Sequence, residues 1–321
     1  MTAWTDSAGG RRARAILTSR PFLTLAIVVA VWIAASFASR GFGAYGHLRY
    51  LVELGAVIGL VAAGQTFVVI AGGIDLSVAA IVSAISLPLL SWQADPTGLA
   101  SVLAVVALTT AIGVVNGLGV ALLRVHPMIM TLAMATFLQG LLIIIAGGSA
   151  VTAENPLVHW LGNARPAGIP AGILLWIAVS VLVLTLMHAT PFGARIFAMG
   201  ANPVAASLSG VPIISTTLAV YSISGFTAGL AGVLVLGMNG QGYVGIGDPY
   251  LLASIAAVVL GGTSILGGLG TYAGTIPGAI LLVTITALIT VVNASPGWRS
   301  ILFGSLILGL LLLSGREQAR R

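Results

Sequence analysis

The segment AGGIDLSVAA, residues 71–80, places a carboxylate, two adjacent glycines and a serine between two long apolar runs. Asp75 has two possible uses there. A carboxylate can cap the first amide groups of the helix that follows, or it can hold a proton or cation inside a bilayer. Cap chemistry and hairpin geometry both favour an acid or serine at this position, so we interpret Asp75 as a cap. Gly72 and Gly73 would then supply the positive φ and the close backbone approach of a tight turn.

Three neutral polar residues, Gln65, Asn116 and Gln139, interrupt apolar runs elsewhere in the chain. Neutral polar side chains often form hydrogen bonds between membrane helices. They could equally line a pore that passes a hydroxylated solute. The sequence leaves both interpretations open.

Glycine is densest in GGTSILGGLGTYAGTIPGA, residues 261–279. Close helix packing does not require this much glycine. We therefore expect an irregular segment that is buried in protein or faces a water path, since irregular backbone survives at bilayer depth only there. A double glycine ends both VVIAGG (68–73) and AVVLGG (257–262), a weak sign of an internal repeat. The candidate pore or helix-junction residues are Gln65, Gly72, Gly73, Asp75, Ser77, Asn116, Gln139, Gly261 and Gly262.

Several chemistries are excluded by residues that the chain lacks. It has no cysteine, and all 13 basic residues are arginine. A phosphate-binding P-loop needs a lysine, so any nucleotide that powers this protein must be bound by another chain. The four histidines lack the i, i+4 spacing of a helical metal site. We expect no metal, no cofactor in this chain and no enzymatic activity.

The composition identifies the environment of the chain. Of its 321 residues, 58% are hydrophobic and 6% are charged, and the mean hydropathy is +1.12. A soluble domain carries about a quarter charged residues. Most of this surface must therefore face lipid, and the long continuous apolar runs exclude a membrane β-barrel. The sequence predicts an all-α polytopic membrane protein.

About ten transmembrane helices are expected, because a span needs about 20 mostly apolar residues. The eighth is too short to cross alone, which favours a broken or re-entrant segment over 250–270. The expected spans are 22–38, 51–71, 74–90, 99–123, 128–147, 169–188, 215–237, 250–262, 272–292 and 300–314.

The distribution of arginine sets the expected orientation. A cytoplasmic amino terminus puts nine arginines inside and four outside. The inside set is Arg11, Arg12, Arg14, Arg20, Arg124, Arg195, Arg316, Arg320 and Arg321, and the outside set is Arg40, Arg49, Arg165 and Arg299. We expect a cytoplasmic tail over 1–20, one transmembrane domain over 21–314 and a second cytoplasmic tail over 315–321.

The inner loop over 189–213 is too polar and too rich in glycine for a span, yet it keeps the apolar spacing of a helix. Asn202 followed by Pro203 is a typical helix start. We expect two short helices on the cytoplasmic face, separated by the letters GAN.

Four blocks of sequence carry a resemblance. They are GQTFVVIAGGIDLSV (64–78), HPMIMTLAMATFLQGL (126–141), TPFGARIFAMGANPVAASLSGV (190–211) and YLLASIAAVVLGGTSILGGLGTYAGTIPGAIL (250–281). Together they resemble the membrane permease subunits of bacterial ribose/xylose-type ABC sugar importers, within the wider branched-chain amino acid/sugar permease superfamily. The resemblance extends from about residue 20 to 314.

The resemblance implies how such a chain works. Two permease copies, identical or not, pair in the inner membrane, two cytoplasmic ATPase subunits bind ATP and Mg, and a periplasmic binding protein delivers the sugar. The ATPase contacts coupling helices in the inner loop. The residues that match this pattern are Arg195, Gly200, Asn202, Ala205, Ala206, Ser209 and Gly210.

Other functions stay open at this point. The chain could be an ABC permease for branched-chain amino acids or another small polar metabolite. It could also be an ion-coupled secondary transporter that uses Asp75, or a passive facilitator. The sequence does not reveal the solute or the residues that contact it.

Overall fold

The computed structural model describes residues 19–39, 41–85, 97–147, 149–152, 155–291, 295 and 297–318. Most of the expected tail over 1–20, residues 86–90 of the expected span 74–90, and positions 319–321 lie outside the described residues. The described part of the expected carboxyl-terminal tail, as far as Gln318, continues the last helix.

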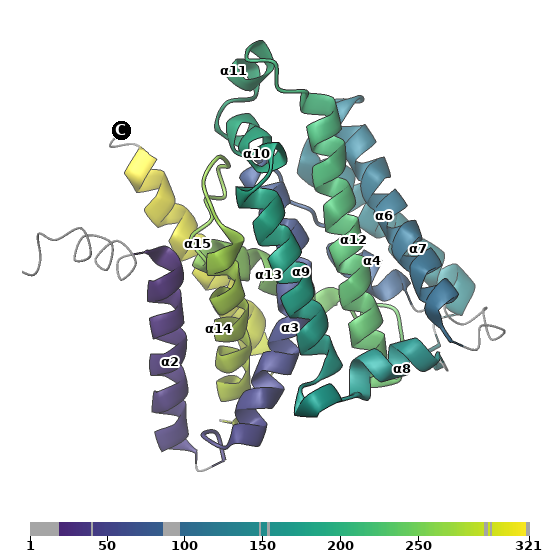
Figure 1. Ribbon diagram of the computed structural model, residues 1–321, viewed down its shortest axis with the longest axis vertical. Coiled ribbons are helices and arrows are strands. Elements are labelled where there is room, and N and C mark those ends of the chain that lie inside the picture. The colour runs from purple at the N-terminus through teal and green to yellow at the C-terminus, as the bar shows by residue number, and fades with distance from the viewer. Residues whose placement is uncertain are drawn as a thin grey trace, which may run out of the picture.

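The described chain is almost entirely helical (Figure 1). The longer helices are α2 (Arg20–Ala38), α3 (Tyr45–Ile70), α6 (Leu99–Ala121), α7 (Pro127–Ala146), α9 (Ala171–His188), α12 (Ile213–Asn239), α13 (Asp248–Leu260), α14 (Tyr272–Val291) and α15 (Gly297–Gln318). The shorter elements are α4 (Val78–Ala84), α8 (Pro156–Asn163), the 3-10 turn η1 (Pro166–Gly168), α10 (Pro191–Ala201) and α11 (Pro203–Leu208). Two-residue strands β1 (Val151–Thr152) and β2 (Gln241–Gly242) pair antiparallel, with Val151 opposite Gly242.

Six of the described helices are long and apolar enough to cross a membrane: α3, α6, α7, α9, α12 and α14. Helices α2 and α13 are apolar but shorter, and α4 has only 7 residues. The prediction of a helical membrane protein is confirmed. The expected ten crossings stay a prediction.

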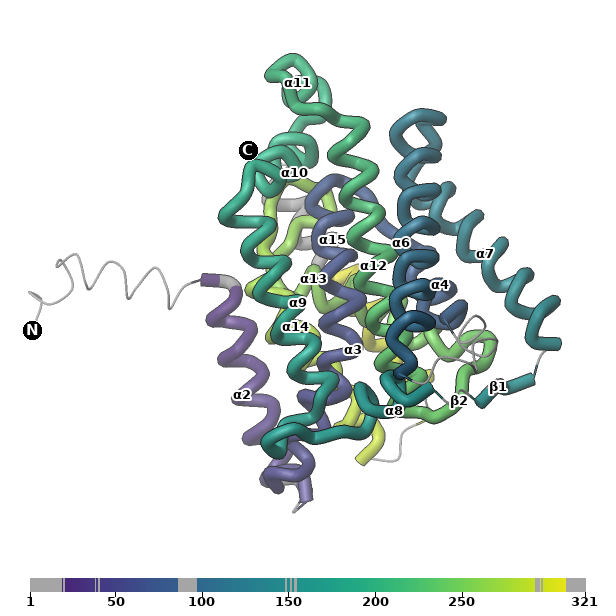
Figure 2. Tube along the Cα trace, turned by 45° about the vertical axis from the view of Figure 1, so that its right-hand side comes forward, coloured from purple at the N-terminus to yellow at the C-terminus, as the bar shows by residue number. Residues whose placement is uncertain are grey.

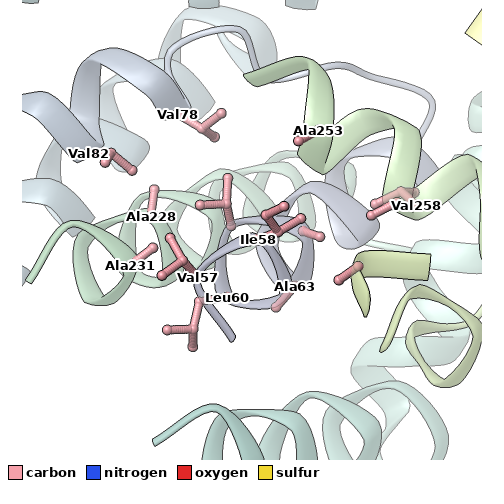
Figure 3. Packing of buried hydrophobic residues seen from close by; sticks show 14 of the residues in the cluster. Val57, Ile58, Leu60, Ala63, Val78, Val82, Ala228, Ala231, Ala253 and Val258 are labelled. Atoms are coloured by element: carbon pink, nitrogen blue, oxygen red, sulfur yellow. The ribbon is translucent and has the colours of Figure 1, made fainter. Parts of the chain in front are cut away.

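Helix α3 is the centre of the bundle. Every residue from Gly55 to Ile70 is buried, because α9, α12, α13 and α14 all pack around it (Figures 1 and 2). A helix that is apolar on all sides must be enclosed on all sides. Figure 3 shows α3 side chains such as Val57 and Leu60 among residues of α4, α12 and α13. The core therefore fixes the position of the carboxyl end of α3.

Small residues bring α6 and α12 into close contact. A Cβ at Gly113 would overlap the carbonyl of Tyr221, and one at Gly225 would overlap the carbonyl of Thr109. Gly117 and Gly229 follow four residues later on each helix. A Cβ at Gly229 would overlap the Thr109 hydroxyl, and one at Gly117 would lie 2.9 Å from the Leu218 Cα. Each helix thus presents a small-xxx-small pair to the other, which lets the two backbones approach.

Helix α7 lies at the edge of the bundle, as Figure 2 shows. In its most apolar stretch 22% of the residues are buried, compared with 89% in α3. Exposed apolar residues, including Ile129, Leu132 and Phe137, cover its outer side. This side of α7 needs lipid or another chain to cover it.

Helices α10 and α11 lie at one end of the bundle, and α8 lies at the other (Figure 1). The predicted break in the loop over 189–213 is confirmed at Asn202, but the other two residues of the expected GAN break, Gly200 and Ala201, lie inside α10. Helix α10 ends at Ala201, and α11 begins at Pro203 after Asn202.

Candidate functional site

The break between α3 and α4 is built from backbone hydrogen bonds at the glycines. The Gly72 N–H donates to the Val69 carbonyl over 3.0 Å, and the Gly73 N–H donates to the Val68 carbonyl over 2.9 Å. Gly72 has a φ of 87°. This bond pair around a left-handed residue is a Schellman motif, which ends a helix. A Cβ at Gly73 would lie 2.7 Å from the Tyr221 hydroxyl, so the second glycine provides the expected close approach.

Helix α13 ends in the same way. The Gly262 N–H donates to the Val259 carbonyl over 2.9 Å, and the Thr263 N–H donates to the Val258 carbonyl over 3.2 Å. Gly262 has a φ of 92°. The two interruptions have the same geometry, with Gly262 in the role of Gly72. An alignment of the two double glycines would instead pair Gly262 with Gly73, so the two motifs are offset by one position.

The side chain of Gln65 holds the chain that leaves the α3 end. Its Nε2 donates to the Asp75 carbonyl oxygen over 3.0 Å, and its Oε1 accepts from the Asp75 N–H over 3.1 Å. Both residues are fully buried. The amide of Gln65 therefore replaces the backbone partners that the broken helix no longer offers to Asp75.

The Asp75 carboxylate accepts three hydrogen bonds. Its Oδ1 accepts from the Ser77 N–H over 2.9 Å and from the Ser77 hydroxyl over 2.6 Å. Its Oδ2 accepts from the Ser224 hydroxyl of α12 over 2.7 Å. The Asn116 Nδ2 of α6 donates to the Ser77 hydroxyl over 2.9 Å and extends the network. The carboxylate thus connects the junction directly to α12, and the Ser77 hydroxyl connects it to α6.

The geometry corrects the interpretation of Asp75 as a helix cap. Helix α4 begins at Val78, and no amide within it donates to the carboxylate. The side chain instead closes a short turn onto Ser77. It reaches α12 because the junction lies inside the bundle. Among the described residues, no arginine or histidine forms an ion pair with Asp75, so hydroxyl and amide donors compensate its burial.

Thr131 and Ser224 belong to this site, but no sequence pattern indicated either of them. The Thr131 hydroxyl of α7 accepts from the Leu76 N–H over 3.0 Å and lies 3.2 Å from the Ile74 carbonyl. Hydroxyl residues are common in membrane helices and usually bond their own backbone. Neither residue differs in type or spacing from many other Ser and Thr, so only tertiary contact identifies them.

Two of the neutral polar candidates behave differently. Asn116 is fully buried in the network, and its Oδ1 has no hydrogen-bond partner among the described residues. Gln139 lies half-buried on α7, eight residues beyond Thr131, and no hydrogen bond connects it to Asp75 or its partners in the described structure. The structure brings Gln65, Asn116 and Ser77 together with Asp75 and leaves Gln139 outside.

Backbone contacts connect this junction to α10. A Cβ at Gly200 would overlap the carbonyl oxygen of Ile70, the last residue of α3. The same Ile70 oxygen accepts from the Gly268 N–H over 2.9 Å. A Cβ at Gly267 would lie 2.8 Å from the Gly200 oxygen and 3.1 Å from the Gly72 Cα. Helix α10, the α3 end and the loop after α13 therefore meet at glycines.

The expected irregular segment over 261–279 is irregular only as far as Thr271, because α14 begins at Tyr272 and contains Pro277. Gly261 packs against Gly274 so closely that a Cβ on either would overlap the backbone of the other. The Tyr272 hydroxyl donates to the Gly59 carbonyl over 2.9 Å. The irregular loop is thus held at both ends.

The candidate coupling residues lie on the α10–α11 pair. Asn202 caps α11, since its Oδ1 accepts from the Val204 and Ala205 N–H groups at 3.0 Å. Ala206 is buried, whereas Arg195 and Ala205 are exposed. Ser209 and Gly210 follow the helix and are also exposed, and Gly210 has a φ of 83°. No group of metal-ligating side chains occurs within the described residues.

Comparison with known proteins places these features in a family. The profile described as "Branched-chain amino acid transport system / permease component" matches residues 48–311. The chain is 32% identical to the ribose import permease protein RbsC of Escherichia coli over 324 residues, covering 98% of this chain and 99% of that one. Identity to the ribose import permease protein RbsC of Bacillus subtilis is 33% over 304 residues, 93% of each chain. Identity to the L-arabinose transport system permease protein AraH of Escherichia coli is 30% over 304 residues, 92% of this chain and 90% of that one.

Proposed function

The chain belongs to the family of branched-chain amino acid transport system permease components, and on that premise we propose that it is the permease subunit of an ATP-binding-cassette importer. Its cargo in this proposal is a monosaccharide of the ribose or xylose type, delivered by a periplasmic binding protein. The names of the relatives, two ribose import permeases and an L-arabinose transport system permease, support a sugar as cargo.

The observation that carries the proposal is the exposed helix pair at one end of the bundle. On α11, Val204 is 70% exposed and Leu208 is 86% exposed, while Ala206 points inward. Val204 and Leu208 lie one helical turn apart and together leave an apolar patch that lipid or another chain must cover. A separate cytoplasmic ATPase is the partner that fits, because this chain has no lysine with which to build a P-loop.

The coupling route in this proposal runs through the glycine contacts. ATP-driven closure of the ATPase subunits displaces α10. Gly200 transmits the displacement to Ile70 and to Gly268, because no side chain separates these backbones. Five residues after Ile70, the buried Asp75 connects the α3–α4 junction to α12. Packed helices with two arrangements are the usual means of such a transition.

A second permease copy is the proposed partner at the outer side of α7. A groove there is lined by α7 residues alone, including Leu132, Phe137 and Leu141. The translocation path would form between the two copies. A homodimer and a heterodimer fit this chain equally well.

The remaining parts of the proposal concern topology and chemistry. The chain is a multi-pass protein of the inner membrane. We place ten crossings in one permease domain over 21–314, with both termini in the cytoplasm. The apolar helix α2 supports a crossing beyond the six long ones, whereas α13, with 13 residues, is too short to cross alone. ATP and Mg are bound by the partner ATPase, and this subunit has no enzymatic activity of its own.

Two alternatives lead to different measurements. An ion-coupled transporter would use Asp75, the buried carboxylate of the junction. A permease for branched-chain amino acids or another small polar metabolite would keep the same ATP-driven mechanism. The family description supports the second alternative, whereas the sugar-importing relatives favour a sugar.

Reconstitution separates these functions. The chain is placed in liposomes alone or with its ATPase and binding protein, and uptake of labelled ribose, xylose and leucine is measured with internal ATP or with an ion gradient. The proposal predicts pentose uptake only with ATP and both partners. Uptake of a pentose by the chain alone, driven by an ion gradient, would contradict the proposal.

A further inference from the structure

A cavity of about 420 Å³ lies at the end of the bundle opposite α10 and α11. It is formed between α3, α13, α14 and α15, away from the Asp75 junction. Ligand sites commonly have volumes of about 300–1,000 Å³. The cavity is therefore large enough to hold part of a bound molecule.

Polar groups gather at the mouth of this cavity. His47 and Tyr50 come from the first turns of α3, Thr290 comes from the last turn of α14, and Arg299 comes from the first turn of α15. Tyr250 of α13 lies within electrostatic reach of Arg299 and Tyr50. The ends of α3, α13, α14 and α15 therefore meet here, and their polar side chains form a rim around the cavity mouth.

Two nitrogen atoms of this rim are buried and unsatisfied. The His47 Nε2 and the Arg299 Nε have no hydrogen-bond partner among the described residues. Buried polar atoms without hydrogen-bond partners are costly. The cavity lining contains no acidic residue, and no described carboxylate forms an ion pair with Arg299. The rim therefore carries a positive charge without a counter-charge.

The cavity becomes apolar with depth. Along α3 the lining changes from His47 to Ile58, about 16 Å further along the axis at 1.5 Å per residue. Along α14 it changes from Thr290 and Thr286 to Val283, and along α15 from Arg299 to Phe303. The site therefore has a cationic head region and an apolar tail region in line with the helices.

Exposed aromatic residues mark the level of the rim. Tyr50 is 52% exposed, and Trp298, next to Arg299, is 58% exposed. Tyr and Trp are enriched where a membrane meets water. The polar rim is thus at the height of lipid headgroups, and the apolar part is at the height of acyl chains.

We propose that this cavity binds an anionic phospholipid, with its phosphodiester at Arg299 and His47 and one acyl chain along the apolar wall of α3, α14 and α15. Arginine binds phosphate through charge-assisted hydrogen bonds. A neutral ligand would leave the guanidinium without a counter-charge, and a free anion would leave the apolar wall without an occupant. The site does not depend on which solute the chain transports.

The test uses the full chain in a neutral detergent and measures bound lipid by native mass spectrometry. Phosphatidylglycerol is compared with phosphatidylcholine of the same acyl chains, with glycerol 3-phosphate, with inorganic phosphate and with ribose. We expect retention of phosphatidylglycerol over the other four. Arg299→Gln should weaken this retention about tenfold, since a hydrogen bond to a charged group is lost.

Two further variants keep the result interpretable. Arg49→Gln removes a nearby arginine of α3 that does not line the cavity, and its lipid retention should equal that of the unmodified chain. Ala287→Phe fills the apolar part without changing any charge and should reduce retention as well. If Arg299→Gln does not fold, loss of retention in a folded Ala287→Phe variant still supports the site. Equal retention of both phospholipids, equal binding of the headgroup analogues, or selective binding of ribose would overturn the proposal.

Discussion

Gln65 and Asp75 form two reciprocal hydrogen bonds, at 3.0 and 3.1 Å, between the amide of one side chain and the backbone of the other residue. The Gln65 side chain pairs with both the N–H and the carbonyl of Asp75, as a neighbouring strand would pair with an extended residue. The junction therefore keeps a fixed shape although it has left the helix.

Replacing Gln65 with Leu should destabilise the protein. The substitution leaves the buried N–H and carbonyl of Asp75 without partners, at a cost of about 2 kcal/mol or more. Thermal unfolding in detergent measures the effect. Gln139→Leu is the matched control, because Gln139 is half-buried and outside the network, and it should change the unfolding temperature little. Equal effects of the two substitutions would refute this role of Gln65.

Asp75→Asn should leave ATP-driven uptake within a few-fold of the unmodified chain. Asparagine retains one oxygen for the Ser77 donors, and its amide can donate to the Ser224 hydroxyl, which then accepts. Asp75→Leu should abolish uptake, because it leaves these buried groups unpaired. Uptake is measured in liposomes between pH 6 and 8. If Asp75 carried a proton, the Asn variant would lose coupled uptake. That outcome would show that the carboxylate takes part in proton transfer and is not only structural.

Gly200→Ala should uncouple transport from ATP hydrolysis. The added Cβ would overlap the Ile70 carbonyl oxygen and force α10 away from the α3 end, at a cost of about 2 kcal/mol. ATP hydrolysis and sugar uptake are measured in the same liposomes, and we expect uptake to fall more than hydrolysis. Gly46→Ala is the control, since a Cβ at this helical glycine meets nothing within 4 Å. Unchanged uptake per ATP in Gly200→Ala would exclude the proposed route.

Charge reversal at Arg195 should weaken binding of the ATPase, as should Leu208→Ser. Both side chains are exposed on the α10–α11 pair. Neither substitution removes a packed side chain, so the unfolding temperature should stay constant while co-purification of the ATPase falls. Arg165→Glu, an exposed arginine of the loop between α8 and α9, is the control and should not affect co-purification. Full co-purification of both α10–α11 variants would place the docking surface elsewhere.

Local signals in the sequence predicted the helical parts well. The apolar runs indicated the long helices, and Asn202 before Pro203 indicated the start of α11, because capping depends on neighbouring residues alone. Gly72 and Gly73 likewise indicated the end of α3. These features are local, so one sequence is sufficient to find them.

Features that depend on tertiary contact escaped prediction. Helix α3 is apolar on all sides, so no periodic pattern showed which neighbours would enclose it. The Asp75 partner on α12, Ser224, lies 149 positions along the chain and resembles any other serine. Asn116 of α6 joins the network only through Ser77, 39 positions before it. The expected cap geometry was wrong because the junction turned out to lie inside the bundle, where a carboxylate can reach a second helix.

The two matched helix ends at Gly72 and Gly262 have a consequence for how the chain can be divided. The loop after Gly262 packs against the end of α3 at Gly72, so the parts of the chain before and after residue 262 contact each other closely at this point. A fragment that stops before residue 262 would expose the Ile70 carbonyl and would lack the loop against which α10 packs. Neither part should fold without the other. Two co-expressed parts should associate only if both keep the glycines of this contact.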